Sequence, residues 1–244
     1  MPFSLDMQAY LTDRFYRHLH CRFPEQAYNA MLTAFHLYAF QRGLRAAQRA
    51  VRDNVPLDFE HYQAYREVVS TPEMKALDKP SRAEHTLTPE EFVGRTYECL
   101  THDLFRELDS PAEVELLFCR HIDSLNVAGF NPDLHYVSES TLYESSCCVQ
   151  RSRHPQFTPG MELGRRMPDA PPYPFIVANE FYAFRQVLTA IFGQEGETVS
   201  QLAQVDFIQR YGQDCWDQVS QYEGADFNIP YPLCLGSCKK ETKA

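Results

Sequence analysis

Residues 119–148, CRHIDSLNVAGFNPDLHYVSESTLYESSCC, decide the fold class of this chain. A helix is expected to end at Gly129, and a Phe-Asn-Pro turn follows it. Alternating side chains from Leu134 to Glu139 predict a strand, and a turn at 144–146 leads into a second strand, 147–152. The stretch therefore predicts an α+β core in which a helix is followed by a hairpin.

The residues before this stretch extend the core. Ser110-Pro111-Ala112-Glu113 has the form of a capping box and predicts the start of the helix. Cys119 and Asp123, four residues apart, are expected to lie one above the other at the edge of its apolar face. His121 falls inside that face and is interpreted as a core histidine. Before the helix, residues 92–99 predict a strand and residues 101–108 a short helix.

Helical patterns surround the core on both sides. We expect helices at about residues 4–20, 25–54, 58–69, 175–192 and 198–222, with a polar connecting segment at 71–91. Residues 1–75 form a helical segment, 92–153 the α+β core, 154–174 a proline-rich loop and 175–222 a second helical segment. The fold class is α+β, with both helical segments packed around a small antiparallel sheet as one compact unit.

Composition excludes some classes of partner. The net charge is −10, from 23 Lys and Arg against 33 Asp and Glu, which argues against binding nucleic acid or an anionic membrane. No apolar run is long enough to cross a bilayer, and the first residues lack the pattern of a secretory signal. We expect a cytoplasmic protein that acts on a small molecule, and its aromatic-rich helices could form a homodimer face.

The eight cysteines contain no CxxC pair. Zinc bound by cysteines therefore stays open but is not favoured, and no cofactor is expected. Cys147 and Cys148 are neighbours on a strand, so at most one of them faces a given pocket.

Four arginines, Arg42, Arg45, Arg49 and Arg52, follow one stripe of the second predicted helix. Two interpretations stay open for them. Such a stripe is usually a solvated face, but in an acidic protein it could also face a cleft that binds a carboxylate.

Several motifs resemble one family. Residues 38–71, YAFQRGLRAAQRAVRDNVPLDFEHYQAYREVVST, are followed by Cys99, LLFCRHID, GFNPDL and the strand with Cys148. In this order they resemble the L-2-amino-thiazoline-4-carboxylic acid hydrolase family over roughly residues 5–220. The resemblance implies an α+β ligand-binding domain of the 4-vinyl reductase type, and hydrolytic opening of a carboxylated cyclic amidine to a carbamoylated cysteine.

The resemblance also carries over to single residues. The positions that match the family motifs are Arg42 and Arg45 on an RGxR-like helix, Cys99, the Cys-x-x-x-Asp pair Cys119 and Asp123, Phe130 and Asn131 of the Gly-Phe-Asn-Pro turn, and Cys148. The chain departs from the pattern at Leu100-Thr101, where relatives usually have Pro-Trp, and at Arg66, where a glycine is common.

The chemistry of these residues leaves the mechanism open. A thiol can attack an amidine carbon if a neighbour lowers its pKa, and Cys99, Cys119 and Cys148 are rival nucleophiles. Asp123 could orient water or protonate the leaving group, although its charge alone would raise the pKa of Cys119. Arg42 and Arg45 are candidates for the substrate carboxylate.

Asn131 and Phe130 are candidate substrate contacts, although for Asn131 the favoured interpretation is that its side chain caps the turn before Pro132. Three classes of function remain: a cofactor-independent hydrolase of a small carboxylated nitrogen ring, a non-catalytic small-molecule sensor, and a metal-dependent enzyme with cysteine ligands.

Overall fold

The computed structural model describes residues 3–67, 82–88, 90–154, 156 and 170–235. In chain order, the elements are α1 (Leu5–Arg22), α2 (Ala27–Arg52), α3 (Phe59–Tyr65), β1 (Arg82–Leu87), β2 (Phe92–Glu98), α5 (Leu100–Glu107), α6 (Ala112–Phe130), η1 (Pro132–Leu134), β3 (Tyr136–Ser140), β4 (Cys148–Ser152), α7 (Tyr173–Phe192), α8 (Gln194–Tyr211), α9 (Gln213–Ser220) and η2 (Leu233–Leu235). The chain is thus α+β, as predicted, with helices and a four-stranded antiparallel sheet.

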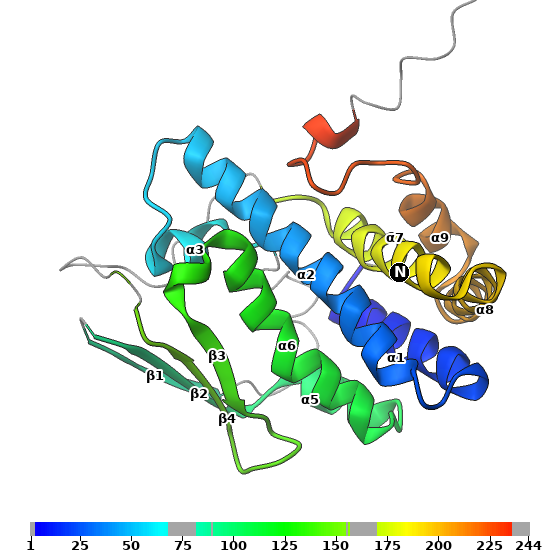
Figure 1. The fold of residues 1–244 in the computed structure, drawn as a ribbon, viewed down its shortest axis with the longest axis horizontal. Coiled ribbons are helices and arrows are strands. Elements are labelled where there is room, and N and C mark those ends of the chain that lie inside the picture. Colours follow the sequence, from blue (N-terminus) through cyan, green and yellow to red (C-terminus); the bar gives the residue numbers. More distant parts are fainter. Residues whose placement is uncertain (1–2, 68–81, 89, 155, 157–169, 236–244) are drawn as a thin grey trace, which may run out of the picture.

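Helix α2 runs between two halves of the molecule (Figure 1). On one side it packs against α6, which contacts strand β3 of the sheet, and on the other side it packs against α7. The α2–α6 contact is close because both helices carry a glycine there: a Cβ on Gly43 would lie 2.0 Å from the backbone oxygen of Asn126, and one on Gly129 would lie 2.5 Å from that of Phe40. Polar side chains on α2 therefore lie near both α6 and α7.

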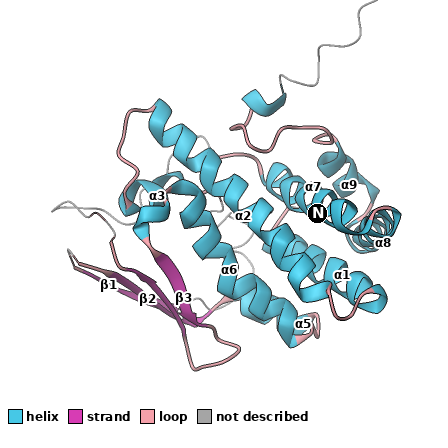
Figure 2. Ribbon diagram, viewed as in Figure 1, coloured by secondary structure: helices cyan, strands magenta, loops and turns pink. Residues whose placement is uncertain are grey.

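The four strands form an antiparallel sheet in the order β1-β2-β4-β3 (Figure 2). In the register, Phe92 pairs with Ser152, Gly94 with Gln150 and Thr96 with Cys148. Phe59 of α3 packs on Phe92 of β2, with ring centroids 4.6 Å apart, and so joins α3 to the sheet. The sheet, α3 and α6 thus bound the region that holds the predicted site residues.

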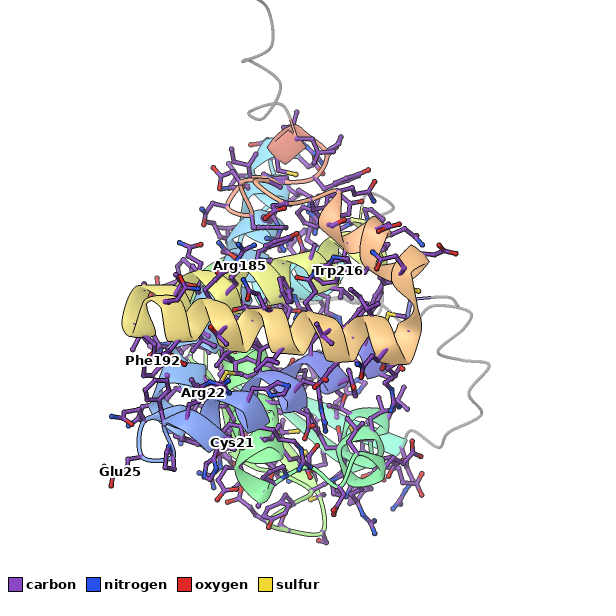
Figure 3. All side chains as sticks on the ribbon, turned by 90° about the vertical axis from the view of Figure 1, so that its right-hand side faces the viewer. Cys21, Arg22, Glu25, Arg185, Phe192 and Trp216 are labelled. Atoms are coloured by element: carbon purple, nitrogen blue, oxygen red, sulfur yellow. The ribbon has the colours of Figure 1, made fainter. Side chains whose placement is uncertain are left out.

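Helices α7, α8 and α9 pack on the side of α1 and α2 away from the sheet (Figure 3). Trp216 of α9 lies edge-on to Phe181 of α7, with ring centroids 4.8 Å apart, and Phe192 stacks on Phe23 at 4.3 Å. Cys21 and Arg22 lie at the exposed end of α1 on this face. In the part of the chain that the structure describes, no helix has both the length and the apolar character needed to cross a bilayer.

The helices differ from prediction mainly at their ends. The expected helix 198–222 is two helices, because Gly212 has a φ of 89°, a conformation that interrupts a helix. Helix α3 ends at Tyr65 rather than Val69, and Val69 lies outside the described residues.

The predicted capping box at Ser110 is wrong. Pro111 occupies the N-cap position of α6, and the Ser110 hydroxyl is buried without a hydrogen-bond partner. The backbone N–H of Ser110 donates to Phe105 O at 3.0 Å, so this residue belongs to the turn that ends α5. The helix that follows runs one residue beyond the predicted end at Gly129.

The connecting segment predicted at 71–91 contains strand β1. Five of its six residues are exposed, so no apolar alternation marks the strand in the sequence. Strand β1 is an edge strand of the sheet, and among the described strands its backbone pairs with β2 alone. Most of the proline-rich loop predicted at 154–174 lies outside the described residues.

Candidate functional site

A polar cluster lies between α6 and the sheet. Gln150 of β4 donates a 2.7 Å hydrogen bond from Nε2 to Asp123 Oδ2, which identifies the sheet face that α6 covers. Alternation along β4 places Cys148 on the same face, and the register places Tyr136 and Ser138 of β3 there as well. The Ser138 hydroxyl is buried and has no hydrogen-bond partner among the residues that the structure describes. We call these five residues the α6–sheet cluster.

The structure brings the predicted thiols to this cluster. Cys119 lies one helical turn before Asp123 on α6, and Cys99 lies between β2 and α5. Cys99, Cys119 and Cys148 are all half-buried. Cys99, Cys148 and Asp123 each lie close enough to Cys119 to raise its pKa. Cys147 precedes β4, and its carbonyl accepts hydrogen bonds from Ser140 and Ser145 in the turn. The four predicted catalytic residues therefore converge, while their catalytic roles stay predictions.

The electrostatics of the cluster favour protonated thiols. Burial raises the pKa of Cys119 well above its ordinary value, and the nearby thiols and carboxylates raise it further. Burial also raises the pKa of Cys148 to about 11, although the Leu142 N–H, 3.3 Å from its sulfur, acts to lower it. At neutral pH these two thiols are therefore poor nucleophiles, because the thiolate is the reactive form.

Asp123 has the properties of an acid–base group. Burial raises its pKa, while the charges of Arg66 and Arg42 and the Gln150 hydrogen bond act in the opposite direction. General acid–base catalysis uses carboxyl groups whose pKa is raised by burial. The side chain is half-buried rather than sealed from solvent.

Arg42 presents a buried positive charge near this cluster. The residue is 7% exposed, and its Nη1 donates to Tyr38 Oη at 3.2 Å. Its Nε has no hydrogen-bond partner in the described part of the chain. Within the described residues it forms no ion pair, although Asp123 and Glu180 both lie within its electrostatic reach. A buried guanidinium in this state favours an anion as an additional partner.

Arg45, one turn further along α2, is fully engaged. It is 0% exposed, and its Nε donates to Glu67 Oε1 at 2.8 Å while its Nη2 donates to Oε2 at 2.5 Å. Its Nη1 donates to the carbonyl of Phe227. This arginine holds α2 to the segments around residues 67 and 227, and each of its three guanidinium nitrogens donates a hydrogen bond within the protein.

The first three arginines of the stripe, Arg42, Arg45 and Arg49, are buried, so the solvated-face interpretation is wrong for them. Arg49 is 2% exposed and donates to the carbonyl of Tyr65. Arg52 is exposed beside Asp53, as the solvated-face interpretation expects.

The two turn residues have structural roles in this arrangement. Asn131 Oδ1 accepts from the backbone N–H of Asp133 at 3.0 Å, and its Nδ2 donates to Leu57 O at 2.7 Å. This is the capping role that the sequence favoured. Phe130 is 3% exposed and packs edge-on against Tyr62, with centroids 5.6 Å apart. Both side chains therefore contribute to packing or capping within the fold.

Sequence reasoning missed four residues of this region. Gln150, Tyr136 and Ser138 could have been found from strand alternation, because two-residue steps from Cys148 and from Leu134 reach the same face. Arg66 was noticed only as a departure from the family pattern, yet its charge acts on Asp123.

A second group of charged residues lies on the other face of the sheet. Glu90, Glu91, Glu139, Arg151 and Arg153 line a surface hollow there. Arg151 is ion-paired with Glu139 at 2.7 Å and also with Glu91, so these charges are matched within the protein. The hollow contains none of the predicted site residues.

Across the described ranges, no three His, Cys, Asp or Glu side chains are grouped so that they could hold a metal ion. His102 pairs through Nδ1 with Glu115 beside the thiols. Comparison with protein-family models, with curated proteins and with solved structures gives no match for this chain.

Proposed function

We propose that this protein is a hydrolase that opens a small carboxylated ring at a cyclic amidine or amide carbon. One observation carries the proposal: a half-buried carboxyl group with a raised pKa, Asp123, lies within electrostatic reach of Arg42, a buried guanidinium without an ion pair in the described residues. The first group suits proton transfer and the second suits a substrate carboxylate. The resemblance to the L-2-amino-thiazoline-4-carboxylic acid hydrolase family supports the same chemistry, and a fold of the 4-vinyl reductase type is part of the proposal.

In the proposed reaction, water rather than a thiol attacks the ring carbon. Ionised Asp123 takes a proton from the water as the water oxygen bonds to the amidine carbon, and gives that proton to the ring nitrogen as the C=N bond becomes single. Asp123 then takes the proton of the new hydroxyl as the carbonyl forms, and gives it to the leaving ring sulfur or nitrogen as the ring bond breaks. The reaction consumes one water molecule and leaves Asp123 as it began. Cys119 and Cys148 stay protonated and line the ring, since burial raises the pKa of both thiols.

Substrate binding is assigned to Arg42 rather than Arg45. Both were candidates, but the guanidinium of Arg45 is held by Glu67 and by the Phe227 carbonyl. Asn131 and Phe130 are assigned to the scaffold for the same kind of reason. A cytoplasmic location is part of the proposal, because Cys21, Cys99, Cys119, Cys147 and Cys148 are free thiols.

The test is turnover of 2-aminothiazoline-4-carboxylate in ¹⁸O-labelled water, followed by mass spectrometry of a carbamoylated cysteine. We expect one labelled oxygen in the product and a loss of at least about 100-fold in kcat for Asp123→Asn, the scale of general acid–base catalysis. Asp133→Asn, an exposed carboxylate, is the matched control and should retain full activity. Full activity of Asp123→Asn would contradict the proposed role.

The cysteines need a separate comparison. Cys119→Ser and Cys148→Ser should reduce turnover only modestly if the thiols line the ring, whereas a nucleophile would be lost completely. Cys147→Ser is the matched control beside Cys148. Tight binding of the ring with no product after long incubation would instead favour the sensor function, and the zinc and homodimer alternatives stay predictions.

A further inference from the structure

A second buried carboxylate lies on the far side of Arg42 from the α6–sheet cluster. Glu180 of α7 is 0% exposed. Its Oε1 accepts from Thr12 Oγ1 at 2.8 Å and its Oε2 accepts from Gln8 Nε2 at 2.9 Å, both donors lying on α1. Within the described residues Glu180 forms hydrogen bonds but no ion pair. A carboxylate in that state is costly to bury, so it needs a reason to be there.

Hydrogen bonds connect Glu180 to Arg42. Gln8 Nε2 donates both to Glu180 and to Tyr38 Oη, and the same Tyr38 oxygen accepts from Arg42 Nη1 at 3.2 Å. The Tyr173 hydroxyl donates to Gln8 Oε1 at 2.8 Å, which fixes the orientation of the Gln8 amide. Three helices, α1, α2 and α7, thus supply one continuous chain from the carboxylate to the guanidinium.

We propose that Glu180 is a positioning residue for Arg42 and that its protonation is coupled to the binding of a carboxylate ligand there. This inference rests on the proposed function, in which Arg42 holds the substrate carboxylate. Neutral Glu180 leaves the positive field of Arg42 available to an anion, whereas ionised Glu180 cancels part of that field. The hydrogen-bond chain through Gln8 and Tyr38 holds the guanidinium in place in both states.

The surrounding groups set the direction of the coupling. Burial raises the pKa of Glu180 to about 8, while the Gln8 and Thr12 hydrogen bonds and the Arg42 charge act to lower it. Besides Glu180, the ionisable groups around Arg42 are Tyr38 on its own helix, Tyr62, Glu67, Asp123 and Tyr173.

An anion on Arg42 would remove the stabilising charge and so raise the pKa of Glu180 further. Binding above pH 8 would therefore take up a proton, and affinity would fall as the pH rises.

The experiment is calorimetric titration of 2-aminothiazoline-4-carboxylate, with acetate as the minimal carboxylate, from about pH 7 to about pH 10. The parent protein carries Asp123→Asn, which prevents turnover and removes the titration of Asp123. We expect Kd to increase by up to about tenfold per pH unit above pH 8 in this protein, and to stay constant after Glu180→Gln is added. Glu195→Gln, an exposed carboxylate on α8, is the control and should keep the parent profile.

The outcomes separate the two proposals. Equal pH profiles with and without Glu180→Gln overturn the coupling, even if binding still depends on Arg42. Unchanged binding after Arg42→Met overturns the Arg42 site itself, and so does the absence of binding of both probes. Titration in buffers of different ionisation enthalpy gives a readout that does not depend on the Glu180 variant: proton uptake approaching one per ligand above pH 8 supports the coupling, and zero uptake refutes it.

Discussion

Glu180→Gln should change how the stability of the protein depends on pH. Burial raises the pKa of Glu180 from its ordinary value of 4.5 to about 8 in the folded protein. Between these pH values the folded state keeps a proton that the unfolded state has released, so the unfolding free energy falls as the pH rises. The stabilising contribution is complete below pH 4.5, is lost progressively up to about pH 8, and does not change above that.

The interval from 4.5 to about 8, at about 1.4 kcal/mol per pH unit, corresponds to about 5 kcal/mol. Glutamine has nearly the same shape and does not titrate. The variant should therefore gain stability relative to the natural protein by about this amount across the interval, and the gain should level off above pH 8. Other titrating groups contribute equally to both proteins and cancel in the difference.

Urea unfolding can be followed by the fluorescence of Trp216, the single tryptophan, which is 6% exposed against Phe181 and Phe207. Measurements at half-unit steps of pH give the difference curve directly. Glu195→Gln, which removes an exposed carboxylate, serves as the control, and the change attributed to Glu180 should not appear in its difference curve. A flat curve for Glu180→Gln, or one that falls with pH, would refute the assignment of a neutral buried Glu180.

Three further predictions concern α2 and the thiols. Arg45→Met should lower the unfolding free energy by about 3–5 kcal/mol, because it leaves Glu67 buried and unpaired, whereas Arg42→Met should lower it little or even raise it. Equal losses for the two variants in urea unfolding would contradict this contrast. Gly43→Ala should lower the unfolding free energy by about 2–3 kcal/mol in the same assay, since the Cβ of the alanine would meet the backbone of α6. An unchanged midpoint would show that α2 and α6 can move apart without cost. At neutral pH, iodoacetamide should label Cys148 of the folded protein at least about 100-fold more slowly than Cys148 of the unfolded chain, because its pKa in the folded protein is about 11 rather than 9. Exposed Cys21 is the internal control, and equal labelling rates of Cys148 by mass spectrometry would exclude the raised pKa.

Local patterns predicted the main elements of the fold. Periodicity identified α2 and the helix face of α6, and alternation identified the hairpin of β3 and β4 with its antiparallel pairing. Strand β1 was missed because five of its six residues are exposed, and only its hydrogen bonds to β2 define it. Ser110 was misread because a capping sequence does not reveal that its N–H is already bound to the end of α5.

The site was predictable only in part. Spacing placed Cys119 and Asp123 on one edge of the helix, and strand alternation allowed only one of Cys147 and Cys148 to face it. Glu180 was overlooked, although a lone carboxylate in the apolar helix FIVANEFYAF is a recognisable signal of a buried acid. Its hydrogen bonds to α1 could not be inferred, since Gln8 and Thr12 lie more than 160 residues away in the chain.

The amino-acid sequence by itself determined which residues share a helix face or a strand face, because those relations follow from the fixed geometry of the backbone. The roles of Arg42 and Arg45 depended on the tertiary structure. The two arginines lie on the same stripe of one helix, and local pattern does not distinguish them. Glu67 and the Phe227 carbonyl, brought in from distant segments, bind Arg45. Arg42 instead lies within electrostatic reach of half-buried Asp123 and buried Glu180, without an ion pair in the described residues. Long-range packing therefore decides which arginine forms a buried ion pair and which has none within the described residues.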